Sequence, residues 1–99
     1  MEAKNNTANQ KFEVRLNAEV AELQYRLSDQ TLYLMHTEVP DSMSGKGIAS
    51  LMAKTALIYA KTSNFQVVAY CPFTVGYVKK HPEYLTLINQ DKQSLDRFK

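Results

Sequence analysis

Apolar and polar residues alternate along the first third of the chain. The two alternating apolar sets are Phe12, Val14 and Leu16, then Ala21, Leu23, Tyr25 and Leu27. A period of two places every second side chain on the same face of a strand, so two half-buried strands are predicted. Turn candidates at 17–19 and 28–30 connect them to a third apolar segment, 32–39. That segment carries apolar residues on both faces, which predicts a strand covered on both sides near the middle of the sheet.

The period becomes helical after Pro40. Residues 40–47 are rich in turn formers, and a helix is predicted from Ile48 to a break at 62–64. Its expected apolar stripe is Ile48, Leu51, Met52, Thr55, Ile58 and Tyr59. A short apolar strand follows at 65–70. A strand, a helix and a strand in this order imply a parallel, right-handed crossover.

A second helix is predicted to begin at Pro72, because proline is favoured at the first helical position. Phe73, Tyr77 and Val78 form its expected apolar stripe, and Pro82 ends it. Two further segments are polar: 1–10 is predicted to be a frayed tail, and residues from about 90 onward are expected to be loose. The predicted order is βββαβα, a single α/β domain over 1–99 with a mixed sheet.

Length and charge narrow the function classes. Ninety-nine residues make one domain, and a net charge of +2 spread along the chain does not form a nucleic-acid footprint. No segment has the apolar length of a membrane span. Cys71 is the only cysteine, which favours a reducing compartment, and we expect a cytoplasmic protein. No metal is expected, since the histidines and the cysteine lack ligand spacing.

The junction between the third strand and the first helix suits an anion. The first turn of a helix leaves amide groups without intrahelical acceptors, and its dipole adds positive charge there. Gly45 and Gly47 would let the backbone approach a phosphate closely, and Lys46 would add a charge. Spacing alone does not separate this site from an ordinary turn.

Two blocks of sequence carry a resemblance. They are 36–40 with 44–51 (HTEVP and SGKGIASL) and 70–73 with 77–84 (YCPF and YVKKHPEY). Together they resemble the cofactor motif of a small GNAT-like N-acetyltransferase family. In the superfamily's phosphate motif, Gly47 and Ala49 fit the small positions. Ser44 stands where arginine or glutamine is usual, at a position that contributes mainly through its backbone.

The resemblance implies a minimal GNAT-like acyl-CoA N-acyltransferase fold that binds acetyl-CoA. The third strand and the 65–70 strand would splay apart, and the Glu38–Val39 backbone would hold the acyl-pantetheine arm. The cofactor-binding residues it implies are Glu38, Val39, Ser44, Gly45, Lys46, Gly47, Ile48, Ala49 and Ser50. The acceptor would be an amine of a small molecule or a protein, at an open site. Neither nucleic acid nor membrane is expected as a partner, and the protein would be a monomer or a weak dimer.

Two side chains are candidates for catalysis. If Pro72 opens a helix, Cys71 lies at its N-cap, where the dipole favours thiolate. The resemblance places Cys71 beside the acetyl group, where it could accept the acetyl covalently or stay unreacted. The alternative is a small buried hydrophobe. In the family, a tyrosine on this helix often protonates the departing thiolate, and Tyr77 could fill that role. Its alternative is packing against Phe73.

Several charged side chains are more ordinary. His36 is expected to be structural, Glu38 to be solvated or paired across strands, and His81 to cap the second helix. Lys79 and Lys80 are expected to form a solvated face. Two other functions stay open beside acetyl transfer: a coenzyme A-binding module without catalysis, and a small protein-interaction domain.

Overall fold

The computed structural model describes all 99 residues and contains one five-stranded sheet, in the order β1-β2-β3-β4-β5. The strands are β1 (Lys4–Asn6), β2 (Lys11–Leu16), β3 (Glu19–Ser28), β4 (Thr31–Glu38) and β5 (Gln66–Ala69). The helices are α1 (Ile48–Thr62) and α2 (Pro72–Lys80), with 3₁₀ segments η1 (Asp41–Met43), η2 (Pro82–Leu87) and η3 (Leu95–Phe98). The mixed α/β class predicted from the sequence is therefore confirmed.

The meander from β2 to β4 is antiparallel, as predicted. Asp29 and Gln30 join β3 to β4 with φ values of 50° and 61°. Two successive positive φ values belong to the tight turn whose twist matches that of paired strands. The crossover through α1 then makes β5 a parallel neighbour of β4, which confirms the predicted strand–helix–strand unit.

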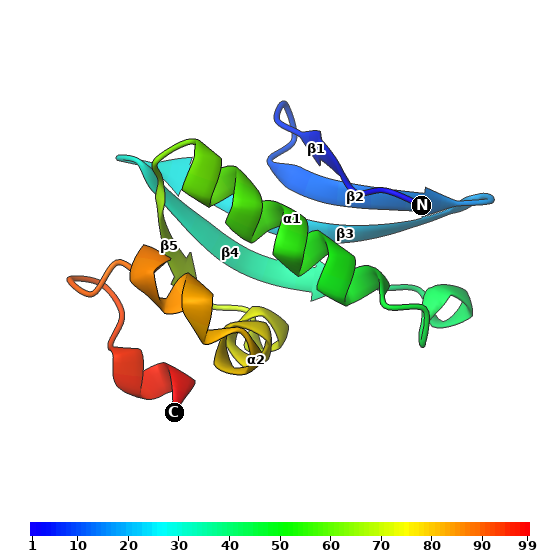
Figure 1. Ribbon diagram of the computed structural model, residues 1–99. Helices are drawn as coiled ribbons and strands as arrows, with labels where there is room; N and C mark the ends of the chain where they lie inside the picture. Colours follow the sequence, from blue (N-terminus) through cyan, green and yellow to red (C-terminus); the bar gives the residue numbers. More distant parts are fainter.

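Helix α1 lies across one face of the sheet, and α2 and the C-terminal segments gather beside β5 (Figure 1). The buried residues of α1 are Ile48, Met52, Ala53, Ala56, Leu57 and Ala60. This corrects the predicted stripe, because Ile58 is 41% exposed. The three alanines have short side chains that let the helix lie close to the strands, and they were not recognised as core residues in the sequence.

The prediction that the third strand is covered on both sides is wrong. Tyr25 pairs with Leu34, whereas Gln24 pairs with His36, so Met35 is an extra residue in β4. A bulge of this kind shifts the alternation of faces along the strand. Met35 is 41% exposed, and His36 is exposed as well. The continuous apolar run therefore reflects a bulge and not a second covering layer.

Both chain ends are more ordered than the sequence suggested. Within the predicted frayed tail 1–10, β1 pairs antiparallel with β2, and the Tyr25 hydroxyl donates a hydrogen bond to Asn5 Oδ1 at 2.7 Å. At the other end, the Gln93 side chain donates to the Ala69 carbonyl (2.7 Å) and accepts from the Ala69 amide (2.8 Å). It thus satisfies the open edge of β5. Phe98 is buried, so the C-terminal residues are not loose.

No helix in this fold has the length and apolar character needed to cross a bilayer.

Candidate functional site

The site begins where β4 and β5 part. Their parallel pairing runs from Thr31–Gln66 to Leu34–Ala69 and stops there. The amides of Tyr70 and Cys71 both donate to the Leu34 carbonyl at 3.0 Å, after which the chain turns into α2. Residues 36–38 pair only with β3, so β4 presents backbone groups toward the gap. This is the splayed pair of parallel strands that the resemblance implied.

The loop beyond β4 ends in a helix start without a side-chain cap. Gly47 is the N-cap of α1 with φ 74°, and no side chain accepts a hydrogen bond from the first turn. The amides of Ile48, Ala49 and Ser50 therefore have no intrahelical acceptor. They point out of the N-terminal end of a fifteen-residue helix, whose dipole adds positive potential there.

Both loop glycines adopt the left-handed conformation, with φ 76° at Gly45 and 74° at Gly47. Apart from the two adjacent residues of the chain, a Cβ atom added to either would meet no heavy atom within 4 Å. The conformation favours glycine, and the open space beside it allows a ligand to approach the backbone. The residues present therefore fit a phosphate group, which would occupy the space that a Cβ would enter.

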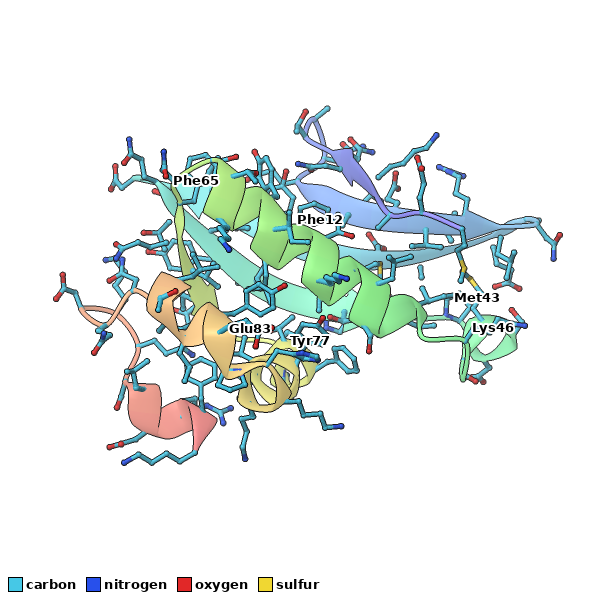
Figure 2. The ribbon with its side chains drawn as sticks, in the orientation of Figure 1. Phe12, Met43, Lys46, Phe65, Tyr77 and Glu83 are labelled. Carbon is cyan, nitrogen blue, oxygen red and sulfur yellow. The ribbon has the colours of Figure 1, made fainter.

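A pocket of about 250 Å³, here called the loop pocket, lies over this helix start. Seven of the predicted cofactor-binding residues line it: Val39, Ser44, Gly45, Gly47, Ile48, Ala49 and Ser50. Met43 and Phe73 complete the lining. Lys46 and Glu38, the other two predicted residues, are exposed and do not line it. Figure 2 shows Lys46 at the outer end of the loop, beyond the start of α1.

Ser44 is engaged within its own loop. Its hydroxyl donates to the Asp41 carbonyl at 2.9 Å, and its amide donates to the same oxygen at 3.1 Å. This closes the 3₁₀ turn of η1. The serine thus shapes the loop that precedes the glycines, in a position where the family usually has a long polar side chain.

Cys71 is the N-cap of α2, as predicted, and it is only 4% exposed. Its Sγ lies 3.0 Å from Thr37 Oγ1 on β4, across the gap between the parting strands. Thr37 pairs with the core residue Leu23 and therefore faces the α1 side of the sheet. Thr37 is not among the site residues predicted from the sequence. A threonine near the end of a strand gives no signal of this contact until the strand pairing is known.

The stripe predicted for α2 is confirmed at Val78, which is buried, and at Tyr77, which packs against the core. It is wrong at Phe73, which is 40% exposed, and the helix also buries Thr74 and Val75. A second pocket of about 450 Å³, here called the α2 groove, lies beside this exposed side. It is lined by Ser50, Pro72, Phe73, Gly76, Tyr77, Lys80 and His81. Ser50 and Phe73 line both pockets, which makes the two spaces neighbours.

Tyr77 is half-buried on the wall of the α2 groove (Figure 2). Its ring stacks on His81 with centroids 4.2 Å apart, and Tyr84 lies 6.3 Å away. Burial raises the pKa of the Tyr77 hydroxyl above its ordinary value of 10.0, and Tyr84 and Glu83 raise this pKa further. The phenol is therefore protonated at neutral pH, which is the state that a proton donor requires. Cys71 lines neither pocket, so the two catalytic candidates do not share one cavity.

The remaining candidates lie away from the loop pocket. The His81 amide donates to the carbonyls of Tyr77 (3.0 Å) and Val78 (3.1 Å), so His81 closes the C-terminal end of α2. His36 and Glu38 are exposed on the sheet face opposite α1, so Glu38 is solvated as expected, whereas His36 is not the enclosed structural histidine that was expected. Glu22 lies opposite Glu38 in the strand register, and two carboxylates do not form an ion pair. Neither side chain faces the loop pocket.

Comparisons with known proteins concern the family and the fold of this chain. A family model described as GCN5-related N-acetyl-transferase matches residues 11–87. Protein NATD1 of Xenopus tropicalis is 38% identical over 74 residues, which cover 72% of this chain and 68% of that protein. Protein NATD1 of Danio rerio is 34% identical over 82 residues, which cover 78% and 74%. A GCN5-like protein from Staphylococcus aureus, solved by NMR, superimposes with a TM-score of 0.67 at 27% identity, covering 88% of this chain and 86% of that one.

Proposed function

Because this chain belongs to the GCN5-related N-acetyltransferase family, we propose that it binds acetyl-CoA at the Ser44–Ser50 loop and transfers acetyl to an amine. The observation that carries the proposal is the uncapped start of α1, with two left-handed glycines whose Cβ positions are open. Backbone amides at such a helix start bind phosphate oxygens. The loop lies beside the one place where β4 has free backbone, so a phosphate and an extended arm can bind together.

In this proposal, the loop pocket and the end of β4 bind different parts of the cofactor. The amides of Ile48, Ala49 and Ser50 bind the pyrophosphate, and Gly45 and Gly47 keep the approach open. The backbone of Glu38 and Val39 binds the pantetheine arm by strand addition, for which side chains matter little. Bound acetyl-CoA supplies an activated acetyl thioester.

The chain's own side chains then supply the proton chemistry. Tyr77 holds a proton at its Oη on the groove wall, and its raised pKa keeps that proton in place at neutral pH. Cys71 is held by the Thr37 contact and is almost fully buried, so it packs beside the gap between the strands. The acceptor amine must arrive neutral, because an ammonium group has no lone pair for attack.

A coenzyme A-binding module without catalysis is the second candidate function. Two observations favour it: Cys71 and Tyr77 line no common cavity, and the Ser44 side chain is turned into its own loop. Both functions share the loop pocket and differ only in turnover.

Thermal unfolding with and without saturating acetyl-CoA tests cofactor binding, which both functions require. A ligand at about 100 times its Kd stabilises a protein by about 2.7 kcal/mol. For a domain of this length, each kcal/mol raises Tm by about 4–8 °C. We expect a clear rise with acetyl-CoA and none with an unrelated nucleotide. An unchanged Tm at saturating acetyl-CoA would reject both functions.

Thiol release from acetyl-CoA, measured with a panel of small amines and lysine peptides, then separates the two functions. Acetyl transfer predicts amine-dependent thiol release that stays with the purified protein. Binding without any amine-dependent release would leave the non-catalytic module as the function.

A further inference from the structure

Strand β3 continues past the end of its neighbour β2. The pairing register of these two strands stops at Lys11 and Gln24, and one further backbone bond runs from the Tyr25 amide to the Gln10 carbonyl. Residues 26–28 pair with β4 alone, and Figure 1 shows the cyan tip of the β3–β4 hairpin extending past the start of β2. We infer that the free side of residues 26–28, here called the β3 edge, binds an extended acidic segment of a partner protein.

A side chain stands in for a neighbouring strand at the β3 edge. The Leu27 amide donates to Gln10 Oε1 at 2.9 Å. The N–H and C=O of one strand residue point to the same edge, so the Leu27 carbonyl faces outward beside that bond. A strand edge in this state is a template for another extended chain, which would pair with Leu27 in place of the glutamine side chain.

The edge of β5 shows the same device in a complete form. There, the Gln93 side chain both donates to the Ala69 carbonyl and accepts from the Ala69 amide. At Leu27, the Gln10 side chain supplies the acceptor alone. The β3 edge is therefore the less protected of the two edges.

The two faces of the β3 edge differ in chemistry. Leu27 pairs with the core residue Leu32 and faces the α1 side of the sheet, yet it is 38% exposed. Arg26 faces the opposite side, is exposed, and takes part in none of the ion pairs of the structure. Because side chains alternate along a strand, an added strand would place one side chain over Leu27 and the next one toward Arg26. The β3 edge therefore favours a segment in which apolar and acidic residues alternate.

A pocket of about 410 Å³ beside Arg26 provides space for the acidic side chain. The charged residues of its lining are Lys11, Arg26 and Glu22, so the lining has a net charge of +1, which favours an anion. Lys11 is already paired with Glu22 at 3.1 Å and with Glu13 at 3.5 Å. Arg26 is thus the cation left for a partner, and a guanidinium can bind a carboxylate through two parallel hydrogen bonds. This inference does not depend on the proposed function, because the β3 edge contributes no residue to the loop pocket.

The test uses a short capped peptide in which valine and glutamate alternate. It is titrated into the isotope-labelled protein, and the backbone amide signals are followed by NMR. We expect saturable shifts at Gln10, Arg26 and Leu27. One control peptide carries lysine in place of glutamate, and another carries N-methyl groups on the valine amides. Each should bind at least about threefold more weakly, because the first loses the charge pair and the second loses the backbone pairing.

Arg26→Gln and Arg15→Gln are the matched variants. Both remove an exposed guanidinium from the same face of the sheet, but Arg15 lies on β2 opposite Val20, near the other end of β3. Arg26→Gln should weaken binding of the glutamate peptide about threefold, the effect of one opposite-charge pair across strands, and Arg15→Gln should leave it unchanged. Leu27→Ser should also weaken binding about threefold, through lost apolar contact, while the preference for glutamate over lysine remains.

Several results would contradict the inference. Absence of saturable shifts at Leu27 with millimolar peptide would overturn it, and so would equal losses in the two arginine variants, because long-range charge would explain them. Equal binding of the N-methylated peptide would exclude strand pairing. Concentration-dependent broadening at Leu27 without peptide, removed by Leu27→Ser, would show that a second copy of this chain occupies the β3 edge instead of an acidic partner.

Discussion

The two helices contribute to the candidate site in opposite ways. The start of α1 offers backbone amides, two left-handed glycines and no charged side chain in the pocket lining. Helix α2 offers side chains: two aromatic rings and a lysine along one stripe, with Cys71 at its N-cap. The first site depends on the path of the chain, and the second depends on the identity of its residues.

This difference predicts how substitutions should act. At α1, a change matters when it alters backbone conformation or fills the space over the amides, whatever its chemistry. At α2, a conservative change of one side chain should alter binding, turnover or stability and leave the other two nearly unchanged. Each prediction below tests one side of this contrast.

Gly47→Val should have the largest effect on binding. The new side chain would enter the open space over the amides of Ile48, Ala49 and Ser50. Losing two charge-assisted hydrogen bonds to phosphate would weaken acetyl-CoA binding on the order of 100-fold. Calorimetry on the purified variant measures this loss.

Gly45→Val is the comparison for position in the loop. Gly45 has nearly the same φ as Gly47, equally open space around its Cβ position and a place in the lining of the loop pocket, but it lies two residues from the helix start. The two variants should therefore lose similar thermal stability, and both should lose affinity, with the larger loss in Gly47→Val. A loss of affinity in Gly45→Val that equals the loss in Gly47→Val would show that closeness to the first amides of α1 does not decide the effect.

Tyr77→Phe should lower turnover more than binding. The phenylalanine ring preserves the stack on His81 and removes only the proton at Oη. General-acid catalysis contributes about 100-fold or more in many enzymes, and we expect roughly 30-fold here because a thiolate leaves readily without help. The variant's kcat should fall while its Kd for acetyl-CoA changes little. A matching rise in Kd would instead assign Tyr77 to binding.

The pH dependence of Tyr77 has a definite sign. Its pKa lies above the ordinary value of 10.0, chiefly through burial, so the hydroxyl keeps its proton up to at least pH 10. The contribution of this raised pKa to the free energy of unfolding is fully present below the ordinary pKa of 10.0, and it is lost as the pH rises through the raised pKa. Turnover should therefore show no decline from Tyr77 ionisation with a midpoint below pH 10. A decline centred near pH 8 that Tyr77→Phe abolishes would contradict this.

The sequence predicted the parts of the fold that depend on local pattern. The alternation of apolar and polar residues identified β2 and β3. The ends of α1 were predicted to within a residue, from the loop that ends at Gly47 and from the break at 62–64. Seven of the nine predicted cofactor-binding residues line one pocket, because a loop and the first turn after it stay close together in any fold.

The errors arose where distant residues decide the structure. β1 has no apolar alternation and is held by pairing with β2 and by the Asn5–Tyr25 bond, across twenty residues. The bulge at Met35 depends on the register with β3, which no local pattern reveals. Thr37 and Cys71 meet only because the chain crosses over through α1. Phe73 resembled a core residue, since periodicity cannot tell a buried face from the face of a groove.

Gly76→Ala should raise stability. Alanine favours the helix by about 1 kcal/mol relative to glycine, which corresponds to a Tm rise of about 4–8 °C in the ligand-free protein. Outside the neighbouring backbone of α2, the added methyl group would meet no heavy atom within 4 Å, so no clash offsets this gain. A thermal melt of the purified variant measures the rise, and a lower Tm would contradict the open space at this position.

Cys71→Ala should have the smallest effect on binding, within about twofold, because a buried thiol that lines neither pocket contributes little to ligand contact. Thr37→Val is the matched variant, since it removes the hydroxyl that meets Sγ and keeps the side-chain shape. If the contact only packs β4 against the start of α2, both variants should lose a little stability and keep full turnover. A loss of turnover in Cys71→Ala at unchanged Kd would instead give the thiol a chemical role, and a partial loss in Thr37→Val would then identify the threonine as the residue that positions it.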